Sequence, residues 1–232
     1  QRYNNDINQV VDYITYMHNV VATLYANEQI YASIKIIRVN DANDPYWGLP
    51  SNSSIAFLNK FGDITRNELY GADIGVLLST KGGTMGGVAW LDGLCLSYNY
   101  QSGPNAGHVG PYAFCNITGS TQNPFPTYSW DASMVTHEIG HLIGSPHTHS
   151  CSWPGGPIDG CNPADGNCQN NLYPSFPPGG GTIMSYCHNG GTVSFTKGFG
   201  PLPGNLVRNN MRNGKSCVSE YLVNPPLMAS AT

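Results

Sequence analysis

The sequence predicts an α/β fold in a single domain, with a larger N-terminal lobe over about residues 1–146, a small irregular lobe over about 147–220 and a tail over 221–232. Two observations predict this fold. Segments with helical spacing of apolar residues alternate with short β-rich runs in the first lobe, whereas glycine, proline and cysteine dominate the second. A chain of 232 residues is also long enough to bury one sizeable core.

Helical and β patterns follow one another from the N-terminus. Apolar residues recur every three or four positions over about residues 5–28, which predicts a long amphipathic helix. The β-rich run 30–39 predicts a strand. Ser51 or Ser53 is a suitable N-cap for a second helix through residues 54–61.

The middle of the chain holds shorter β patterns and one strong helix. The continuous apolar run 72–80 is typical of a strand covered on both faces. The glycine-rich segment 81–97 lacks the GK[ST] ending and the following helix of a phosphate-binding loop, so we interpret it as a turn and an exposed strand. Residues 108–117 predict a further strand broken by a proline, and residues 130–143 predict a helix that ends at Gly144.

Composition and charge exclude several classes of partner. Charged residues make up only 10% of the chain and the net charge is −4, whereas nucleic-acid binding normally requires a basic face. No apolar run is long enough to span a bilayer, so we expect no membrane insertion. Because the chain begins at Gln1 rather than at Met, we expect it to be an excised mature segment. We also expect an N-terminal pro-segment in the precursor, with room for further domains, and we expect a monomer.

The seven cysteines indicate an oxidising compartment. Four of them lie in a glycine- and proline-rich stretch that has little regular structure, and a last one follows a predicted helix over about 203–213. Such stretches usually need covalent ties, so we expect disulfides and a secreted, extracellular protein, with buried thiols of a cytosolic protein as the alternative. Seven is odd, so one thiol is free or pairs outside this chain.

The segment THEIGHLIGSPH, residues 136–147, gathers three of the seven histidines. His137 and His141 are four residues apart, so on a helix both imidazoles reach one metal ion. Gly144 can stop the helix, and the chain then turns to bring His147 to the same ion. With this composition, chance produces the full HExxHxxGxxH pattern in roughly one such sequence in 10⁵.

Three neutral nitrogens with one open position are typical of a catalytic zinc site rather than a structural one. Glu138 lies beside the first ligand, close enough to take a proton from water at the metal. We therefore expect one zinc ion as cofactor and Glu138 as general base. A non-catalytic zinc-binding module, such as an adhesin or an inactive homologue, is the alternative function, and a zinc hydrolase of non-peptide substrates is another.

The motif and the later GTIMSYC, residues 181–187, resemble the metzincin zinc peptidases, whose signature is this zinc motif followed by a methionine turn. The resemblance implies that Met184 packs beneath the three histidines. The runs ADIGVLLST, MGGVAWLDGLC and KSC resemble the adamalysin/reprolysin branch. By that resemblance we expect a metzincin-like twisted, mostly parallel sheet with an antiparallel edge strand, and long helices in the N-terminal lobe.

The chain departs from reprolysins at three points. Thr148 follows the third histidine, where reprolysins usually have Asp. Tyr186 stands two residues after the methionine, as in astacins, serralysins and pappalysins, where this tyrosine can approach zinc and stabilise the transition state. Adamalysin-like domains begin with a strand before the long helix, which here starts almost at once; either that strand is removed or another segment fills its position.

The resemblance also implies how substrate binds. In the family, a peptide lies extended and antiparallel to an edge strand, which we expect here within residues 84–91. The residues of that strand are Gly86, Gly87, Val88, Ala89 and Trp90. The chain is thus expected to be a zinc endopeptidase with protein or peptide substrates.

The sequence constrains disulfide pairing and calcium binding less than it constrains the zinc site. Cys161 and Cys168 are close in one loop and can pair locally, and Cys151 and Cys187 both lie near the zinc motifs, so we pair those two. By resemblance to adamalysins Cys95 pairs with Cys217, and a bridge from Cys95 to Cys115 is the alternative. Two further sets of side chains near these motifs are interpreted as loop or cleft residues rather than ligands: Asp159 and Asp165, which could bind calcium, and His149 and His188, which could bind zinc.

Overall fold

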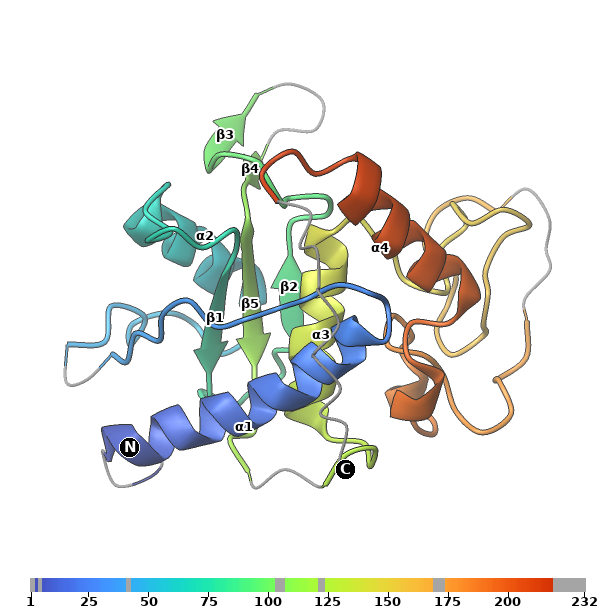
Figure 1. The fold of residues 1–232 in the computed structure, drawn as a ribbon, viewed down its shortest axis with the longest axis horizontal. Coiled ribbons are helices and arrows are strands. Elements are labelled where there is room, and N and C mark those ends of the chain that lie inside the picture. The colour runs from blue at the N-terminus through green and yellow to red at the C-terminus, as the bar shows by residue number, and fades with distance from the viewer. Residues whose placement is uncertain are drawn as a thin grey trace, which may run out of the picture.

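The protein has a mixed α+β architecture in which helices cover both faces of a small mixed sheet (Figure 1). The computed structural model describes Tyr3 and residues 6–40, 43–102, 107–120, 124–168 and 174–218. The predicted tail 221–232 lies outside these ranges. Among the described residues, no helix has the length and apolar character needed to cross a membrane.

The main sheet has three strands in the order β1–β5–β2. The central strand β5 (Tyr112–Asn116) pairs in parallel with β1 (Gly75–Ser79) and antiparallel with β2 (Gly87–Ala89). β2 is therefore an edge strand of this sheet. Strands β3 (Asn99–Gln101) and β4 (Gly107–Val109) form a separate antiparallel hairpin.

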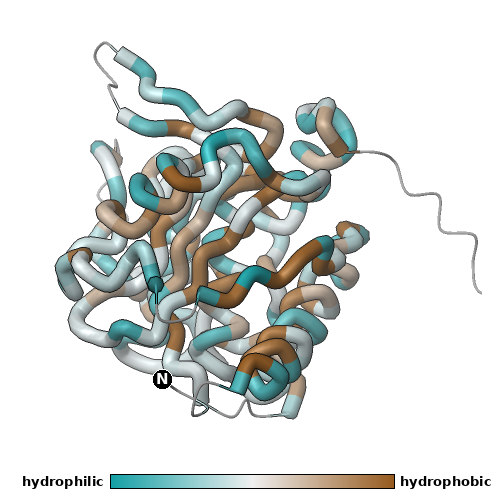
Figure 2. Tube along the Cα trace, turned by 90° about the vertical axis from the view of Figure 1, so that its left-hand side faces the viewer, coloured by the Kyte–Doolittle hydropathy of each residue, from teal (hydrophilic) through white to brown (hydrophobic). Residues whose placement is uncertain are grey.

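Side chains that alternate along β5 divide the core into two clusters. Tyr112 and Phe114 point to one face, where they pack with Phe57 and Leu58 of α2 (Ser54–Thr65). Cys115 belongs to the opposite face, together with buried residues of α1 (Ile7–Ala26) and α3 (Trp130–Leu142). The helix that carries the zinc motif is thus packed against both a sheet and a second helix. Figure 2 shows hydrophobic stretches of the trace running through the middle of the molecule.

The four α-helices within the described ranges lie close to where their sequence patterns predict them. The carboxylate of Asp6 caps α1 by accepting the N–H groups of Asn8 and Gln9, and Ser53 rather than Ser51 caps α2. The last helix, α4, covers Pro201–Asn213, two residues longer at its N-terminus than predicted. Local capping chemistry and apolar spacing therefore suffice to predict these elements.

Three β predictions need correction. The run 30–39 is not a strand: it makes no ladder hydrogen bonds, and Tyr31, Ile34 and Ile36 are exposed. Within the part of the chain that the structure describes, the main sheet therefore has no further parallel strand and is mixed rather than mostly parallel. The strand covered on both faces is β5, all of whose residues are buried, whereas only the middle residue of β1 is buried. The predicted strand 108–117 is split, at Gly110 and Pro111, into β4 and β5.

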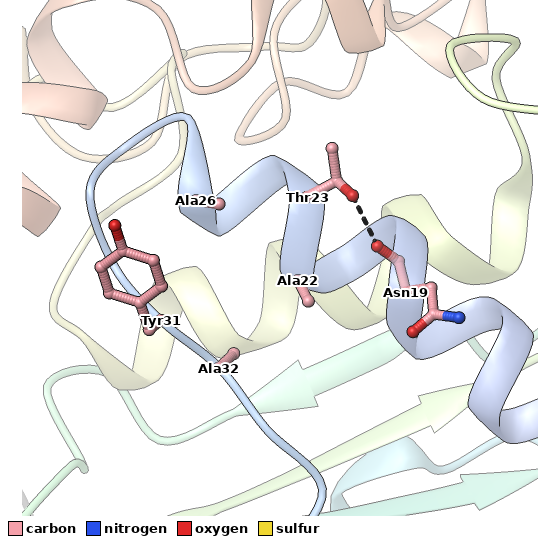
Figure 3. A pocket seen from close by; sticks show the side chains of 6 residues that line it. All are labelled: Asn19, Ala22, Thr23, Ala26, Tyr31 and Ala32. Atoms are coloured by element: carbon pink, nitrogen blue, oxygen red, sulfur yellow. Dashed lines mark hydrogen bonds between the residues drawn. The ribbon is translucent and has the colours of Figure 1, made fainter. Parts of the chain in front are cut away.

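Beyond α3 the described chain is mostly irregular, as predicted (Figure 1). Its regular elements before α4 are two single 3-10 turns, η2 (Cys187–Asn189) and η3 (Phe195–Lys197). A surface hollow lies on α1, lined mainly by small and neutral side chains of α1 and residues 31–32 (Figure 3). None of the predicted zinc or catalytic residues lines it, so it is not the candidate site.

Candidate metal centre

The helix α3 brings the first two histidines of the motif together. His137 and His141 lie one turn apart, and their Nε2 atoms are 3.1 Å from each other. The helix ends just before Gly144, whose φ is +105°. A Cβ at Gly144 would lie 2.7 Å from both Asn210 Nδ2 and Asp92 Oδ1, so a side chain there would displace these two groups and would also be strained by the positive φ. The turn then returns His147, whose Nε2 lies 3.1 Å from that of His141.

Each of the three imidazoles has a hydrogen-bond acceptor at its Nδ1 atom. His137 donates to the carbonyl oxygen of Ile183 at 2.8 Å, His141 to that of Ser145 at 2.7 Å, and His147 to the carboxylate of Asp165 at 2.7 Å. Neutral imidazole carries one N–H, so these bonds fix it on Nδ1 and leave a lone pair on each Nε2. Facing lone pairs 3.1 Å apart repel each other, and a cation between them removes that repulsion.

The three nitrogens fit a zinc ion. They form a group of potential ligands whose donor atoms all lie within 4.8 Å of one another. Four tetrahedral ligands at 2.0–2.1 Å from zinc lie about 3.3 Å apart, close to the separations observed here. Burial lowers the pKa of His141 to about 3 and that of His137 well below its usual value, so both remain neutral, which is the form that binds metal.

One carboxylate oxygen of Glu138 is buried and has no hydrogen-bond partner among the described residues. Its side chain is 3% exposed, and among the described residues its Oε2 atom finds no hydrogen-bond donor. Burial raises the pKa of Glu138 to about 8. Buried carboxylates are normally hydrogen-bonded, so an unpartnered one beside a metal-binding group marks a functional site.

The methionine turn lies against the histidines. Met184 is fully buried, and its carbonyl accepts the N–H of Thr148 at 3.0 Å, which joins the turn to the residue after the third ligand. The ring of Tyr186 packs on His147 and His137, with centroids 4.5 and 5.8 Å apart. Burial raises the pKa of Tyr186 to about 12, so its hydroxyl keeps its proton at neutral pH and can donate a hydrogen bond.

The predicted substrate strand lies beside the glutamate. Residues 87–89 form β2, with Gly86 and Trp90 at its two ends. A Cβ at Gly87 would overlap the Oε1 atom of Glu138 and would lie 2.5 Å from Met134 Sδ. The edge strand therefore passes directly over the carboxylate, and the absence of a side chain at this position permits it.

The end of α3 is held from outside the motif. The N–H of Asp92 donates to the carbonyl of His141 at 2.8 Å, and that of Leu94 donates to the next carbonyl at 3.0 Å. The nearly buried ammonium of Lys215 donates to the Asp92 carboxylate at 2.7 Å and to the Leu94 carbonyl at 3.2 Å. Segment 92–95 thus satisfies helix carbonyls that would otherwise lack donors.

The disulfides correct part of the predicted pairing. Cys95 pairs with Cys217, as the family resemblance implied, and Cys115 is a buried free thiol. The two local pairs were wrong: the structure joins Cys151 to Cys168 and Cys161 to Cys187. The error has a physical cause, because closeness in sequence does not determine which Cβ atoms face each other.

Several side chains near the site have roles that sequence reasoning did not assign. Asp165 accepts a hydrogen bond from His147, and Asp159 accepts the N–H of Cys161. His149 is buried and stacks on His147 with ring centroids 4.8 Å apart, whereas His188 packs against Trp130. No spacing rule connects Asp165 to the motif. Its only signal in the sequence was its position in the cysteine-rich loop.

Comparison with known proteins agrees with this geometry. Residues 1–196 match the reprolysin-type sequence model of metallo-peptidase family M12, which is well over half of the chain. The chain belongs to metallo-peptidase family M12. The resemblance to the reprolysin branch is thereby confirmed, and a comparison with curated proteins found no match. M12 metallopeptidases use zinc, and the three-histidine group of this M12 chain is suited to hold it.

Proposed function

We propose that this M12 chain is the catalytic domain of a secreted, reprolysin-like zinc endopeptidase. The observation that carries the proposal is the convergence of three Nε2 atoms, together with a buried, unpartnered Oε2 on Glu138, the residue that follows His137. His137, His141 and His147 would hold the ion. When bound, zinc supplies a Lewis acid and lowers the pKa of a water molecule to about 7.

Two side chains of the protein act on the proton and on the developing charge. Burial raises the pKa of Glu138 to about 8, but a zinc ion held by the three histidines would favour the charged carboxylate and lower that pKa. The ionised Glu138 then takes a proton from the attacking water at its free oxygen and passes it to the leaving amine. The hydroxyl of Tyr186, which keeps its proton at neutral pH, donates a hydrogen bond to the oxygen of the tetrahedral species. A metal-binding module without activity has no need of a buried carboxylate, whose desolvation is unfavourable.

Substrate binding follows from the position of β2. A peptide that pairs with the edge strand gains main-chain hydrogen bonds along Gly87–Ala89, and its scissile bond then lies close to Glu138, which is directly below Gly87. Because main-chain groups provide this binding, many sequences are accepted and side-chain pockets set the preference. An extended substrate that runs past the site in both directions is cut internally.

The experiment for this function is cleavage of a peptide library whose termini are blocked. The zinc-loaded protein should cut such peptides internally, a chelator should abolish cleavage, and added zinc should restore it. Cleavage that persists in excess chelator, or no cleavage of any peptide by zinc-loaded protein, would overturn the proposal.

Secretion is supported by three disulfides in a chain of an M12 family. Thiol alkylation of the protein isolated from its native source, followed by mass spectrometry, should label only Cys115 after denaturation. Labelling of all seven cysteines would instead indicate a reducing compartment.

A further inference from the structure

The third zinc-binding histidine differs from the other two in what its Nδ1 atom bonds. His137 and His141 donate to backbone carbonyls, whereas His147 donates to the Oδ2 atom of Asp165 at 2.7 Å. The same oxygen lies 3.2 Å from His149 Nε2. A charged acceptor polarises an imidazole more strongly than a carbonyl does.

The third histidine is also the ligand least supported by secondary structure. His147 follows the end of α3, so no helix fixes its ring. Its carbonyl accepts the indole N–H of Trp153 at 2.7 Å and the N–H of Ser150 at 3.1 Å, which hold the backbone. The ring packs against Tyr186 and His149, and the Nδ1 hydrogen bond to Asp165 is its polar contact with a side chain outside the zinc motif.

Asp165 is presented to this ring by a disulfide-closed loop. Its backbone N–H donates to the carbonyl of His149 at 3.0 Å, and its carbonyl accepts the N–H of Cys151 at 2.9 Å. Cys151 in turn is bonded to Cys168, three residues beyond the aspartate. Two backbone hydrogen bonds and one covalent link therefore keep the carboxylate opposite His147.

We propose that Asp165 is a positioning residue for the metal centre: its carboxylate holds His147 in the Nδ1–H tautomer and directs Nε2 at the ion. The Cys151–Cys168 disulfide holds the loop that places this carboxylate opposite His147. The proposal rests on the proposed zinc site. Thr148, the residue directly after His147, carries no charge. The carboxylate beside His147 comes instead from Asp165, 18 residues along the chain. Asp165 acts only through His147 and is not itself a ligand of the zinc.

The size of the effect follows from exposure. Loss of such an outer carboxylate typically weakens metal affinity 10- to 100-fold. The Asp165 side chain is 49% exposed, so water screens its charge and can replace part of the hydrogen bond. We therefore expect a loss near the lower end, about 10-fold, for Asp165→Ala. Asp165→Asn keeps an acceptor oxygen without the charge and should lose less.

The test measures zinc dissociation constants by competition with a chromogenic chelator. The matched control is Asp159→Asn, which removes a carboxylate from the same loop that bonds Cys161 rather than a histidine. The expected order of affinity is parent and Asp159→Asn, then Asp165→Asn, then Asp165→Ala. The absorption bands of the cobalt-loaded protein should shift in the Asp165 variants, because the coordination geometry changes. Equal affinity of Asp165→Ala and parent, or equal losses in Asp159→Asn and Asp165→Asn, would overturn the proposal.

Metal stoichiometry separates this role from that of a second metal site. His147, His149 and Asp165 also form a group that could hold an ion. A positioning role predicts one zinc per chain in the parent protein, bound more weakly in Asp165→Ala. Two ions in the parent and one in the variant would show instead that Asp165 is a ligand.

The loop is tested by a double-variant cycle. If the disulfide acts through Asp165, then Asp165→Ala should weaken zinc binding little further when Cys151→Ser and Cys168→Ser are already present. Fully additive losses would remove the loop from the proposal, and circular dichroism checks that each variant is folded. Should the disulfide variant not fold, the two Asp165 variants still decide the role of the carboxylate. The proposed function fails separately, if His141→Ala binds zinc as tightly as the parent.

Discussion

Gly87 in the edge strand provides the space that the Glu138 carboxylate occupies. The two residues come from β2 and α3, and any side chain at position 87 would overlap the carboxylate oxygen. The close approach links the proposed substrate-binding strand to the proposed general base. In the proposed function, a substrate that pairs with β2 would therefore lie close to the Glu138 carboxylate.

Gly87→Ala should reduce both stability and activity. The added methyl group must displace Glu138 or Met134, which costs about 1–3 kcal/mol of unfolding free energy and lowers kcat. Gly86→Ala is the matched control, because its Cβ would meet only Met134 Cε at 3.9 Å, an ordinary contact. Denaturant unfolding and turnover on a quenched peptide are the measurements. Equal effects at positions 86 and 87 would contradict the contact with Glu138.

Glu138→Ala should separate metal binding from chemistry. The variant should keep about one zinc per chain, since His137, His141 and His147 are unchanged, and lose at least 10²- to 10⁴-fold in peptide hydrolysis, the range for removal of a general base. His141→Ala, the comparison variant, should lose both zinc and activity. Elemental analysis and turnover assays measure the two properties. A zinc-loaded Glu138→Ala protein that cuts peptide at the parent rate would refute the mechanism.

Tyr186→Phe should lower kcat with little change in KM. Phenylalanine retains the ring packing on His147 and His137 and removes only the hydroxyl, so the ground state is nearly unchanged. Loss of one hydrogen bond to developing charge corresponds to about 10- to 100-fold, or about 1.4–2.7 kcal/mol. Steady-state kinetics on one peptide suffice, with zinc content as the control. An unchanged kcat would show that Tyr186 serves only in packing.

Gly140→Ala should destabilise the protein although alanine favours helices. The substitution gains about 1 kcal/mol in helix propensity, but its Cβ would lie 2.6 Å from Met184 Sδ, and overpacking of a core costs about 1–3 kcal/mol. Thermal unfolding of the zinc-loaded protein should therefore occur at a lower temperature. The cost should shrink when Met184→Ala is also present, because the clashing sulfur is gone. Simple addition of the two costs would argue against this contact.

The zinc motif and the helices are predictable from sequence because local chemistry determines them. His137 and His141 are four residues apart, a spacing that places both side chains on one face of a helix. Gly144 has the positive φ that the turn back to His147 requires. The run 30–39 fails for the opposite reason. Its β-branched residues favour an extended strand, but a strand forms only when a neighbouring strand is available to pair with it. The composition of a segment does not show whether such a neighbour exists.

The remaining features depend on contacts between distant segments. Asp165 reaches His147 only after the Cys151–Cys168 bridge has closed the loop, and Gly87 meets Glu138 only after β2 has paired with β5. The disulfide pairs were mispredicted for the same reason, because four cysteines within one irregular stretch have several plausible pairings. Sequence spacing identifies such residues as candidates without indicating their partners.

Lys215 and Cys217 bond to segment 92–95, and this determines where a recombinant form of the domain can end. The family match ends at residue 196, but the ammonium and the disulfide that support the last turn of the zinc helix come after it. A recombinant fragment that stopped at residue 196 would leave Cys95 with an unpaired, oxidisable thiol and would loosen the base of the catalytic helix. The minimal unit for expression and for crystallisation therefore extends through Cys217.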